Sequence, residues 1–207
     1  MNAGTSLLKL VTLTGLPASG KSAVAAALIK RLNLKRIPVA TDRKPRPGDR
    51  HGEYEYLDQR DLDRLISAGE IVAYERLDGQ SYGIRLEALN NLMEKPGIGV
   101  AILTLGRVRI IRSMISGHHH VASIFLPAPT DDQMWVRLRA VGSDPDLISS
   151  RLMLHRRSVP EAQQSEIPFY VPQACHSLGD LIGDVCGHVE AIQQRFTVRH
   201  GVDVRRP

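Results

Sequence analysis

The stretch Gly15-Leu-Pro-Ala-Ser-Gly20-Lys21-Ser22 decides the fold, because it matches the pattern G-x-x-x-x-G-K-[ST] at every fixed position. Glycines let such a loop curl until several backbone N–H groups point inward at phosphate oxygens. An apolar, β-branched segment, Leu7–Thr14, precedes the loop, and an alanine-rich segment with helical spacing, Lys21–Leu32, follows it. A buried strand, a glycine-rich turn and a helix form the context that a phosphate-binding loop requires.

The loop predicts a site for the phosphates of ATP. The residues expected to line this site are Gly15, Pro17, Ala18, Ser19, Gly20, Lys21 and Ser22. Lys21 is the expected catalytic lysine, because this side chain reaches the β- and γ-phosphates in such loops, and the Ser22 hydroxyl is the expected Mg²⁺ ligand. The same loop serves kinases, GTPases and motor ATPases, so the rest of the chain must distinguish between these classes.

Segments of strand character alternate with segments of helix character along the chain. Gly99–Leu105 and Val121–Leu126 are short apolar runs typical of buried strands, and helices are predicted at Arg85–Lys95, Thr130–Ala140 and Ser177–Phe196. The predicted fold class is therefore α/β, a P-loop NTPase with a parallel sheet flanked by helices.

Length and composition limit the choice of partner and compartment. The chain has 207 residues, 43% hydrophobic and 24% charged, which suits one soluble globular domain. A net charge of +5 suits an anionic partner, but aromatic residues make up only 4%, so nucleic acid is not the expected partner. No apolar run is long enough to cross a membrane, the start lacks the pattern of a signal peptide, and Cys175 and Cys186 read as reduced thiols, so the expected compartment is the cytoplasm.

Three further motifs follow the phosphate loop in a fixed order. They are Thr41-Asp-Arg43-Lys-Pro45-Arg46-Pro47-Gly48, then Gly52-Glu-Tyr54-Glu-Tyr56, then Gly79-Gln-Ser-Tyr82-Gly83. In this order and spacing the chain resembles guanylate kinase over roughly residues 7–160. The resemblance implies a phosphotransferase that uses ATP with Mg²⁺ and passes the γ-phosphate to a small phosphomonoester. It also implies one kinase domain over residues 1–207, with a core at 1–37 and 87–207, an acceptor-binding insert at 38–86 and a lid at about 141–150.

The resemblance implies roles for individual residues. Arg43, Arg46, Tyr54 and Tyr82 fall on the positions that grip the acceptor phosphate, and Arg137 and Arg151 fall on two arginines that close a lid over ATP. The chemistry agrees, because an arginine fork matches phosphate oxygens in pairs and a phenol adds a neutral donor. An anionic phosphate oxygen needs no general base, so the implied mechanism is alignment and charge neutralisation.

The chain departs from the family pattern at the positions that read guanine and at one lid arginine. The family serine falls on Val39, the glutamate on Ala73, a second small residue on Ile84 and the lid arginine on Val141, and the strand I-L-D-x-D reads Ile102-Leu-Thr104-Leu-Gly106. A pocket without a carboxylate discriminates poorly in favour of guanine, so we expect altered specificity in which GMP is a poor acceptor.

Two alternatives stay open. One is an enzyme like ribose 1,5-bisphosphate phosphokinase, whose corresponding strand ends similarly to Gly106-Arg107. The other is a non-catalytic binding module with a guanylate-kinase-like fold, although the intact Lys21 and Ser22 favour an enzyme. The acceptor and the oligomeric state do not follow from the sequence.

Overall fold

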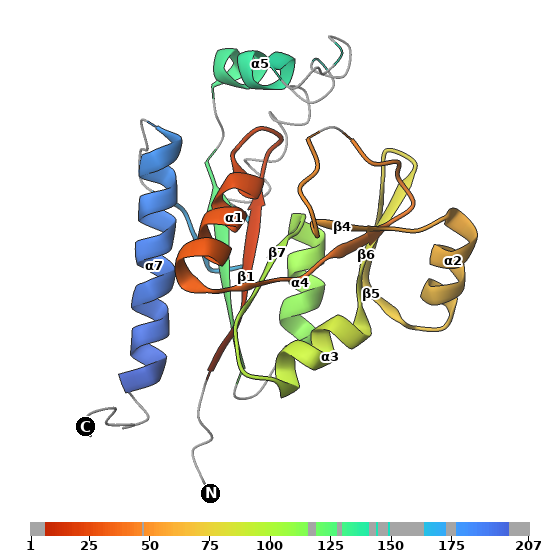
Figure 1. Ribbon diagram of the computed structural model, residues 1–207, viewed down its shortest axis with the longest axis horizontal. Coiled ribbons are helices and arrows are strands. Elements are labelled where there is room, and N and C mark those ends of the chain that lie inside the picture. Colours follow the sequence, from red (N-terminus) through yellow and green to blue (C-terminus); the bar gives the residue numbers. More distant parts are fainter. Residues whose placement is uncertain are drawn as a thin grey trace, which may run out of the picture.

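The computed structural model describes residues 7–46, 48–115, 119–127, 130–140, 144, 149, 164–172 and 177–198. These residues form two sheets with helices around them (Figure 1). The larger sheet comprises β1 (Leu7–Gly15), β2 (Lys35–Arg36), β7 (Gly99–Ile102), β8 (His119–Leu126) and β9 (Phe169–Tyr170), in the order β2-β7-β1-β8-β9. The smaller sheet comprises β3 (Val39–Thr41), β4 (Tyr54–Tyr56), β5 (Ile71–Leu77) and β6 (Gln80–Arg85), in the order β4-β3-β6-β5.

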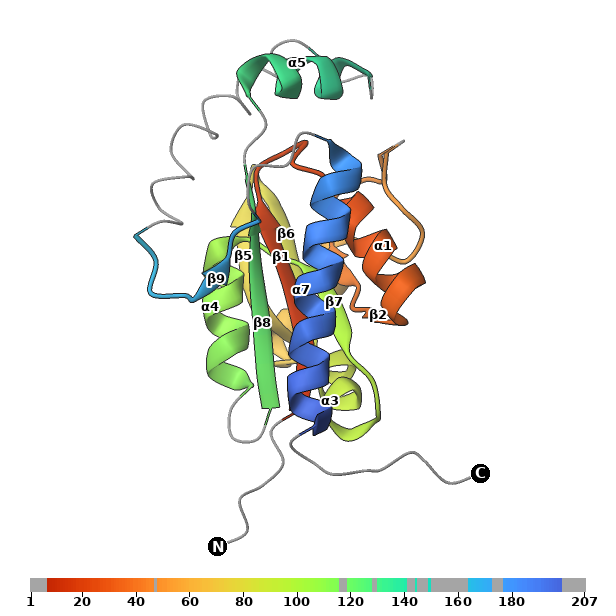
Figure 2. The same cartoon turned by 90° about the vertical axis from the view of Figure 1, so that its left-hand side faces the viewer.

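Helices cover both faces of the larger sheet (Figure 2). The helices of the described residues are α1 (Lys21–Leu32), α2 (Gln59–Ser67), α3 (Leu86–Glu94), α4 (Leu105–Met114), α5 (Asp131–Ala140) and α7 (Leu178–Val198). Of these, α2 packs on the smaller sheet and α5 packs against the phosphate loop. Residues of α1 and α7 pack on one face, and residues of α3 and α4 pack on the other. Each strand pairing described in this sheet is parallel. The predicted α/β class with a parallel sheet flanked by helices is confirmed.

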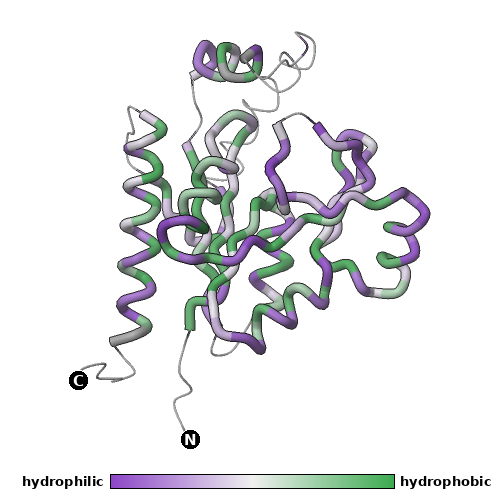
Figure 3. The backbone as a smooth tube through the Cα atoms, viewed as in Figure 1, coloured by the Kyte–Doolittle hydropathy of each residue, from purple (hydrophilic) through white to green (hydrophobic). Residues whose placement is uncertain are grey.

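The core on each side of β1 explains why this strand is apolar along nearly its whole length. Val11 and Leu13 pack with α1 and α7, whereas Leu10 packs with α3 and α4. A parallel strand covered on both faces reads as a continuous hydrophobic run rather than an alternating one. Figure 3 shows the hydrophobic residues concentrated on the central strands, while α2 at the edge carries hydrophilic stretches. The phosphate loop therefore starts from a strand that is buried on both faces.

The smaller sheet lies within the segment expected to bind the acceptor. Its hairpin joins β5 to β6 through Asp78 and Gly79, whose φ angles of 49° and 77° are those of a two-residue hairpin turn. α2 begins after Asp58, whose side chain accepts a hydrogen bond from the backbone N–H of Asp61. The boundaries of the insert at 38–86 and of the core stay a prediction.

A bulge in β5 changes which residue of that strand faces Tyr82. Val72 pairs with Ile84, but further along the hairpin Glu75 pairs with Tyr82, so β5 holds one extra residue. Ala73 lies in the bulge with a left-handed φ of 48°. Directly paired residues project to the same face of a sheet, so Glu75 lies beside Tyr82 on the face that Tyr82 occupies.

The end of the predicted strand Gly99–Leu105 is wrong. β7 ends at Ile102, and α4, which the sequence analysis did not predict, begins at Leu105. β7 pairs with β1 only from Gly99 to Ile102, and the chain then turns so that Val108 and Ile111 pack under the sheet. Within the described ranges, no helix combines the length and apolar character that a membrane span needs.

Candidate active site

The phosphate loop joins β1 to α1 in a conformation that needs both of its glycines. Gly15 has a φ of 151°, and a Cβ built on it would lie 2.9 Å from the carbonyl oxygen of Leu126 and from Ser19 Oγ. Gly20, the residue before α1, has a left-handed φ of 91°. The loop thus curls tightly between the end of β8 and the start of α1, where the positive end of a helix favours an anion.

Lys21 folds back over the loop that it terminates. Its Nζ donates to the carbonyl oxygens of Gly15 at 2.9 Å and Leu16 at 2.5 Å. The ammonium group is therefore held above the first residues of the loop, on a side chain that is only partly buried. This position suits a cation that serves phosphates bound in the loop.

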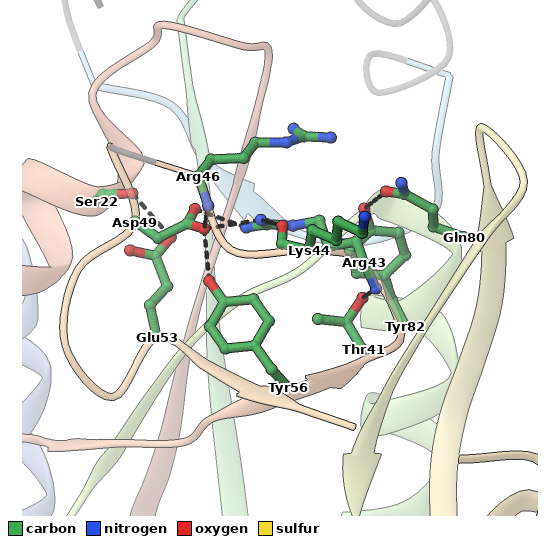
Figure 4. A network of polar contacts seen from close by, with 10 residues as sticks. All are labelled: Ser22, Thr41, Arg43, Lys44, Arg46, Asp49, Glu53, Tyr56, Gln80 and Tyr82. Carbon is green, nitrogen blue, oxygen red and sulfur yellow. Dashed lines mark hydrogen bonds and ion pairs between the residues drawn. The ribbon is translucent and has the colours of Figure 1, made fainter. Parts of the chain in front are cut away.

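Ser22 connects the phosphate loop to the smaller sheet. Its hydroxyl donates to Glu53 Oε1 at 2.9 Å, across the gap between the two parts of the chain (Figure 4). Glu53 is buried, with 7% of its surface exposed. The sequence analysis did not identify this carboxylate as part of the site, because nothing local to Glu53 indicates that it lies beside Ser22.

The expected phosphate grip surrounds a carboxylate in the free protein. Asp49 accepts from both terminal nitrogens of Arg43, at 2.7 and 2.6 Å, and from the backbone N–H of Arg46 at 2.6 Å. The hydroxyl of Tyr56 donates to the same carboxylate at 2.5 Å. Burial opposes the charge of Asp49, but the hydrogen bonds from Arg43, Tyr56 and Arg46 outweigh it and lower the pKa of this carboxyl to about 2. Four donors from the insert thus converge on one anion (Figure 4).

The four predicted grip residues, Arg43, Arg46, Tyr54 and Tyr82, differ from one another in their contacts. Arg43 lies at the centre, with its guanidinium carbon 4.1 Å from the ring centroid of Tyr54. Tyr54 therefore supports Arg43 with its ring face. Arg46 contributes its backbone N–H, while its exposed side chain extends away from Asp49 (Figure 4). The hydroxyl of Tyr82 donates to Gln80 Oε1 at 3.1 Å.

Tyr56 belongs to the donors around Asp49, and the sequence analysis did not include it. It lies two positions after Tyr54 on β4, and side chains two apart on a strand project to the same face. Burial comes first among the causes that raise the pKa of Tyr56 to about 12, and the hydrogen bond to Asp49 adds to it, so this phenol stays a donor at neutral pH. The alternation Tyr54-Glu-Tyr56 was the signal that could have identified it.

A second group of polar residues lies beside Tyr82, where Glu75 is its partner on β5. The Glu75 carboxylate accepts a hydrogen bond from the Thr104 hydroxyl. A Cβ built on Gly106 would lie 3.5 Å from Glu75 Oε1, so this carboxylate occupies the space beside the glycine. The β5 bulge thus brings a carboxylate beside Thr104 and Gly106, two of the positions that the sequence analysis described as uncharged. The expected altered specificity stays a prediction.

Arg107 is buried next to this carboxylate. It is 3% exposed, and its Nε donates to the carbonyl oxygen of Ala73 at 3.0 Å, which holds the bulge in place. Its Nη2 has no hydrogen-bond partner among the described residues. Burial lowers the pKa of Arg107 to about 10, and the nearby Glu75 partly opposes that shift, so the guanidinium stays charged at neutral pH.

The structure describes only part of the expected lid. α5 packs against the phosphate loop through Met134 and Leu138, which contact Ala18. Arg137 belongs to α5, but its side chain lies outside the described residues, as do Arg151, Val141 and most of the expected lid at 141–150. Their roles stay predictions.

The sequence profile of the guanylate kinase family matches residues 8–169. The chain belongs to the guanylate kinase family. It is 33% identical to a guanylate kinase from Frankia casuarinae over 146 residues, which cover 69% of this chain and 78% of that one. It is 30% identical to a guanylate kinase from a Nostoc species over 162 residues, which cover 77% of this chain and 80% of that one.

Solved structures agree on the fold. A crystal structure of guanylate kinase from Anaplasma phagocytophilum superposes with a TM-score of 0.62 at 19% identity, covering 92% of this chain and 88% of that one. A gluconokinase from Sinorhizobium meliloti 1021 gives a TM-score of 0.51 at 14% identity, covering 94% and 99%. Family membership confirms the predicted P-loop kinase, a nucleotide-binding phosphotransferase of guanylate kinase type, and favours neither alternative left open by the sequence.

Proposed function

We propose that this guanylate kinase family member transfers the γ-phosphate of ATP to the phosphate group of GMP. The observation that carries the proposal is the convergence of Arg43, Tyr56 and the Arg46 backbone on the Asp49 carboxylate, close to the phosphate loop. A set of donors that already binds one oxyanion is suited to bind another. The acceptor phosphate would replace Asp49 in the fork of Arg43.

The acceptor phosphate has an advantage over the carboxylate that it displaces. It carries about −1.5 to −2 charge at pH 7 and three oxygens, against one charge and two oxygens for Asp49. Arg46 has an exposed side chain in the free protein and can turn inward to take the additional oxygen. Tyr54 and Tyr82 flank Arg43 and complete the proposed grip.

The donor side consists of the phosphate loop and Lys21. Backbone N–H groups of Gly15–Ser22 would hold the phosphates, and Lys21 would exchange its contacts with the Gly15 and Leu16 carbonyls for phosphate oxygens. The proposed lid arginines, Arg137 and Arg151, would balance charge on the group in transfer.

The loop also fits the expected Mg²⁺ ion. The Ser22 hydroxyl and a carboxylate oxygen of Glu53 lie 2.9 Å apart, and hydroxyl and carboxylate oxygens are the hard ligands that Mg²⁺ takes in proteins. Ser22 is the residue proposed to hold the ion. When bound, Mg²⁺ would neutralise charge on the β- and γ-phosphates of ATP.

The mechanism that these residues support is alignment without a general base. The attacking atom is a phosphate oxygen, which is anionic before the reaction starts. Arg43 and the tyrosines fix its direction, and Lys21 fixes the γ-phosphate on the facing side, so the two reactants become neighbours in one site. The insert and the predicted lid would close over the site and exclude water, which otherwise competes as an acceptor of the phosphoryl group.

The positions of Glu75 and Arg107 support the proposal that GMP is preferred to other acceptors. This proposal replaces the expectation, drawn from the sequence, that GMP is a poor acceptor. Guanine presents an oxygen acceptor next to two N–H donors on one edge. A carboxylate can accept from both N–H groups, and the spare Nη2 of Arg107 can donate to the oxygen. Glu75 lies opposite Tyr82, so a nucleotide whose phosphate lies at Arg43 would extend its base towards this pair.

The test is a comparison of initial rates with Mg-ATP and equal subsaturating GMP, AMP, CMP, UMP and ribose 5-phosphate. We expect GMP to be the best acceptor by more than tenfold. A higher rate with ribose 5-phosphate or with another nucleotide would refute the assignment of the acceptor. No transfer to any phosphomonoester, together with no thermal shift on adding Mg-ATP, would refute the kinase assignment itself.

A further inference from the structure

We infer that Glu53 is a second protein ligand, with Ser22, for the Mg²⁺ of the ATP site. It supplies a carboxylate, which β1 and its two neighbours β7 and β8 do not contain. This inference rests on the proposed ATP site, and it assigns a role to a residue of the insert. P-loop NTPases hold Mg²⁺ with the loop Ser or Thr together with a carboxylate, which in many of them comes from a neighbouring strand. Here β7, the strand beside β1, is followed by Leu103 and Thr104, which carry no charge.

The geometry of Glu53 fits this role. Its Oε1 accepts from the Ser22 hydroxyl, the group expected to face the ion. Its Oε2 is buried and has no hydrogen-bond partner among the residues that the structure describes. The side chain is more than nine-tenths buried, so a carboxylate oxygen is kept out of water with its remaining lone pairs unused. Such an atom costs stability in the free protein and gains a partner when a cation is present.

The backbone around Glu53 holds the carboxylate in this position. Its N–H donates to the carbonyl oxygen of Arg50 at 3.0 Å, and its carbonyl accepts from the N–H of Val39 at 3.1 Å. The first contact closes a tight turn, and the second ties the end of that turn to the smaller sheet. The carboxylate therefore reaches Ser22 from a fixed position.

The test measures metal binding in the absence of turnover. Mn²⁺ is titrated into protein saturated with a non-hydrolysable ATP analogue, and the loss of the free Mn²⁺ signal in electron paramagnetic resonance gives the affinity. We expect Glu53→Gln to weaken Mn²⁺ by ~10- to 100-fold, the usual loss when a group that positions or ligates a metal is removed. Binding of the analogue in EDTA should stay unchanged, and Glu53→Asp, which keeps a carboxylate, should lose less than Glu53→Gln.

Glu55→Gln is the matched control. Glu55 is two residues away on β4, but its carboxylate pairs with Arg85 at 2.6 Å instead of Ser22. Neutralising it should leave Mn²⁺ affinity unchanged. The melting temperature of metal-free Glu53→Gln should stay close to that of the wild type, because glutamine keeps an oxygen that can accept from Ser22, and the lost attraction to Arg36 offsets the removal of a buried charge.

Two results would overturn the inference. One is Mn²⁺ affinity in Glu53→Gln within twofold of the wild type. The other is an equal loss of analogue binding with and without metal, which would give Glu53 a structural role in the loop. If the wild type itself binds no analogue, the proposed ATP site is refuted and this inference with it, so the two failures are distinguishable.

Discussion

Neutralising Glu75 should reduce the preference for guanine while leaving catalysis intact. The substitution Glu75→Gln keeps the shape of the side chain and keeps an oxygen that can accept from the Thr104 hydroxyl. It removes the charge and replaces one acceptor oxygen with an NH₂ group, which faces the N–H donors of guanine with another donor. The neighbouring Arg107 also loses the carboxylate that favours its charged form.

The size of the effect follows from the contacts. A hydrogen bond to a charged group contributes about 1.5–3 kcal/mol, and this change removes such a bond and leaves a donor of guanine unpaired. The free-energy loss corresponds to a fall of ~10- to 150-fold in kcat/KM for GMP, since about 1.4 kcal/mol is a factor of ten. AMP presents a different pattern of donors and acceptors, so its kcat/KM should change by less than threefold.

The assay is kcat/KM for GMP and AMP with saturating Mg-ATP, measured for the wild type, Glu75→Gln and Asp78→Asn. Asp78 is the control because it also carries a carboxylate on the same hairpin, and asparagine tolerates its left-handed φ of 49°. Asp78→Asn should behave as the wild type. Equal losses for GMP and AMP in Glu75→Gln, or a loss for GMP under threefold, would refute the assignment of Glu75 to the base.

Three other outcomes are expected. Lys21→Ala should abolish turnover with a melting temperature close to that of the wild type, as circular dichroism would show, and retained turnover would contradict the phosphate-loop assignment. Arg43→Ala should weaken acceptor binding by calorimetry much more than ATP binding, by ~1.5–3 kcal/mol for a lost charge-assisted contact; equal losses would move Arg43 to the donor side. Folding stability should fall as the pH drops from about 4 to about 2, because the pKa of Asp49 is lowered from 3.8 to about 2 and its contribution is complete only above the higher value. Asp49→Asn should lose that acid dependence in urea titrations, and an unchanged pH profile would count against the Arg43–Asp49 pair.

The phosphate loop was predictable because its determinants are local. Two glycines, one lysine and one serine at fixed spacing specify the turn, and the helix Lys21–Leu32 has the same bounds in the structure as in the prediction. Positive φ angles at Gly15 and Gly20 need only the glycines themselves. The acceptor-binding role of Arg43 followed from the resemblance of one short motif to the guanylate kinase family, and it stays a prediction.

The position of the Glu75 carboxylate beside Tyr82 was not predictable, because it depends on how two strands pair. A regular hairpin would set Tyr74 opposite Tyr82, and one extra residue sets Glu75 there instead. Alanine at position 73 gives no sign of a left-handed φ, and the contact that holds the bulge comes from Arg107 on a helix that the sequence analysis did not predict. Position-by-position comparison therefore placed a neutral residue where the fold places a carboxylate.

The contact of Glu53 with Ser22 was beyond sequence reasoning for a related cause. The two residues are 31 positions apart. Ser22 lies at the start of α1, next to the larger sheet, and Glu53 precedes β4 of the smaller sheet, so no spacing rule joins them. Tyr56, by contrast, could have been found from strand alternation with Tyr54.

The free protein satisfies its phosphate grip with its own carboxylate, and this has a bearing on selectivity. Arg43 is 4% exposed, so leaving its guanidinium unpaired would be costly, and Asp49 prevents that cost before the acceptor arrives. Any ligand of the grip must then exceed what Asp49 already provides. A phosphate monoester does so with more charge and one more oxygen, whereas a nucleoside without phosphate offers nothing to Arg43 and leaves Asp49 in place. In the proposed function, the affinity for the acceptor would be a difference between two anions, and Asp49 would restrict the site to phosphorylated compounds before Glu75 discriminates among them.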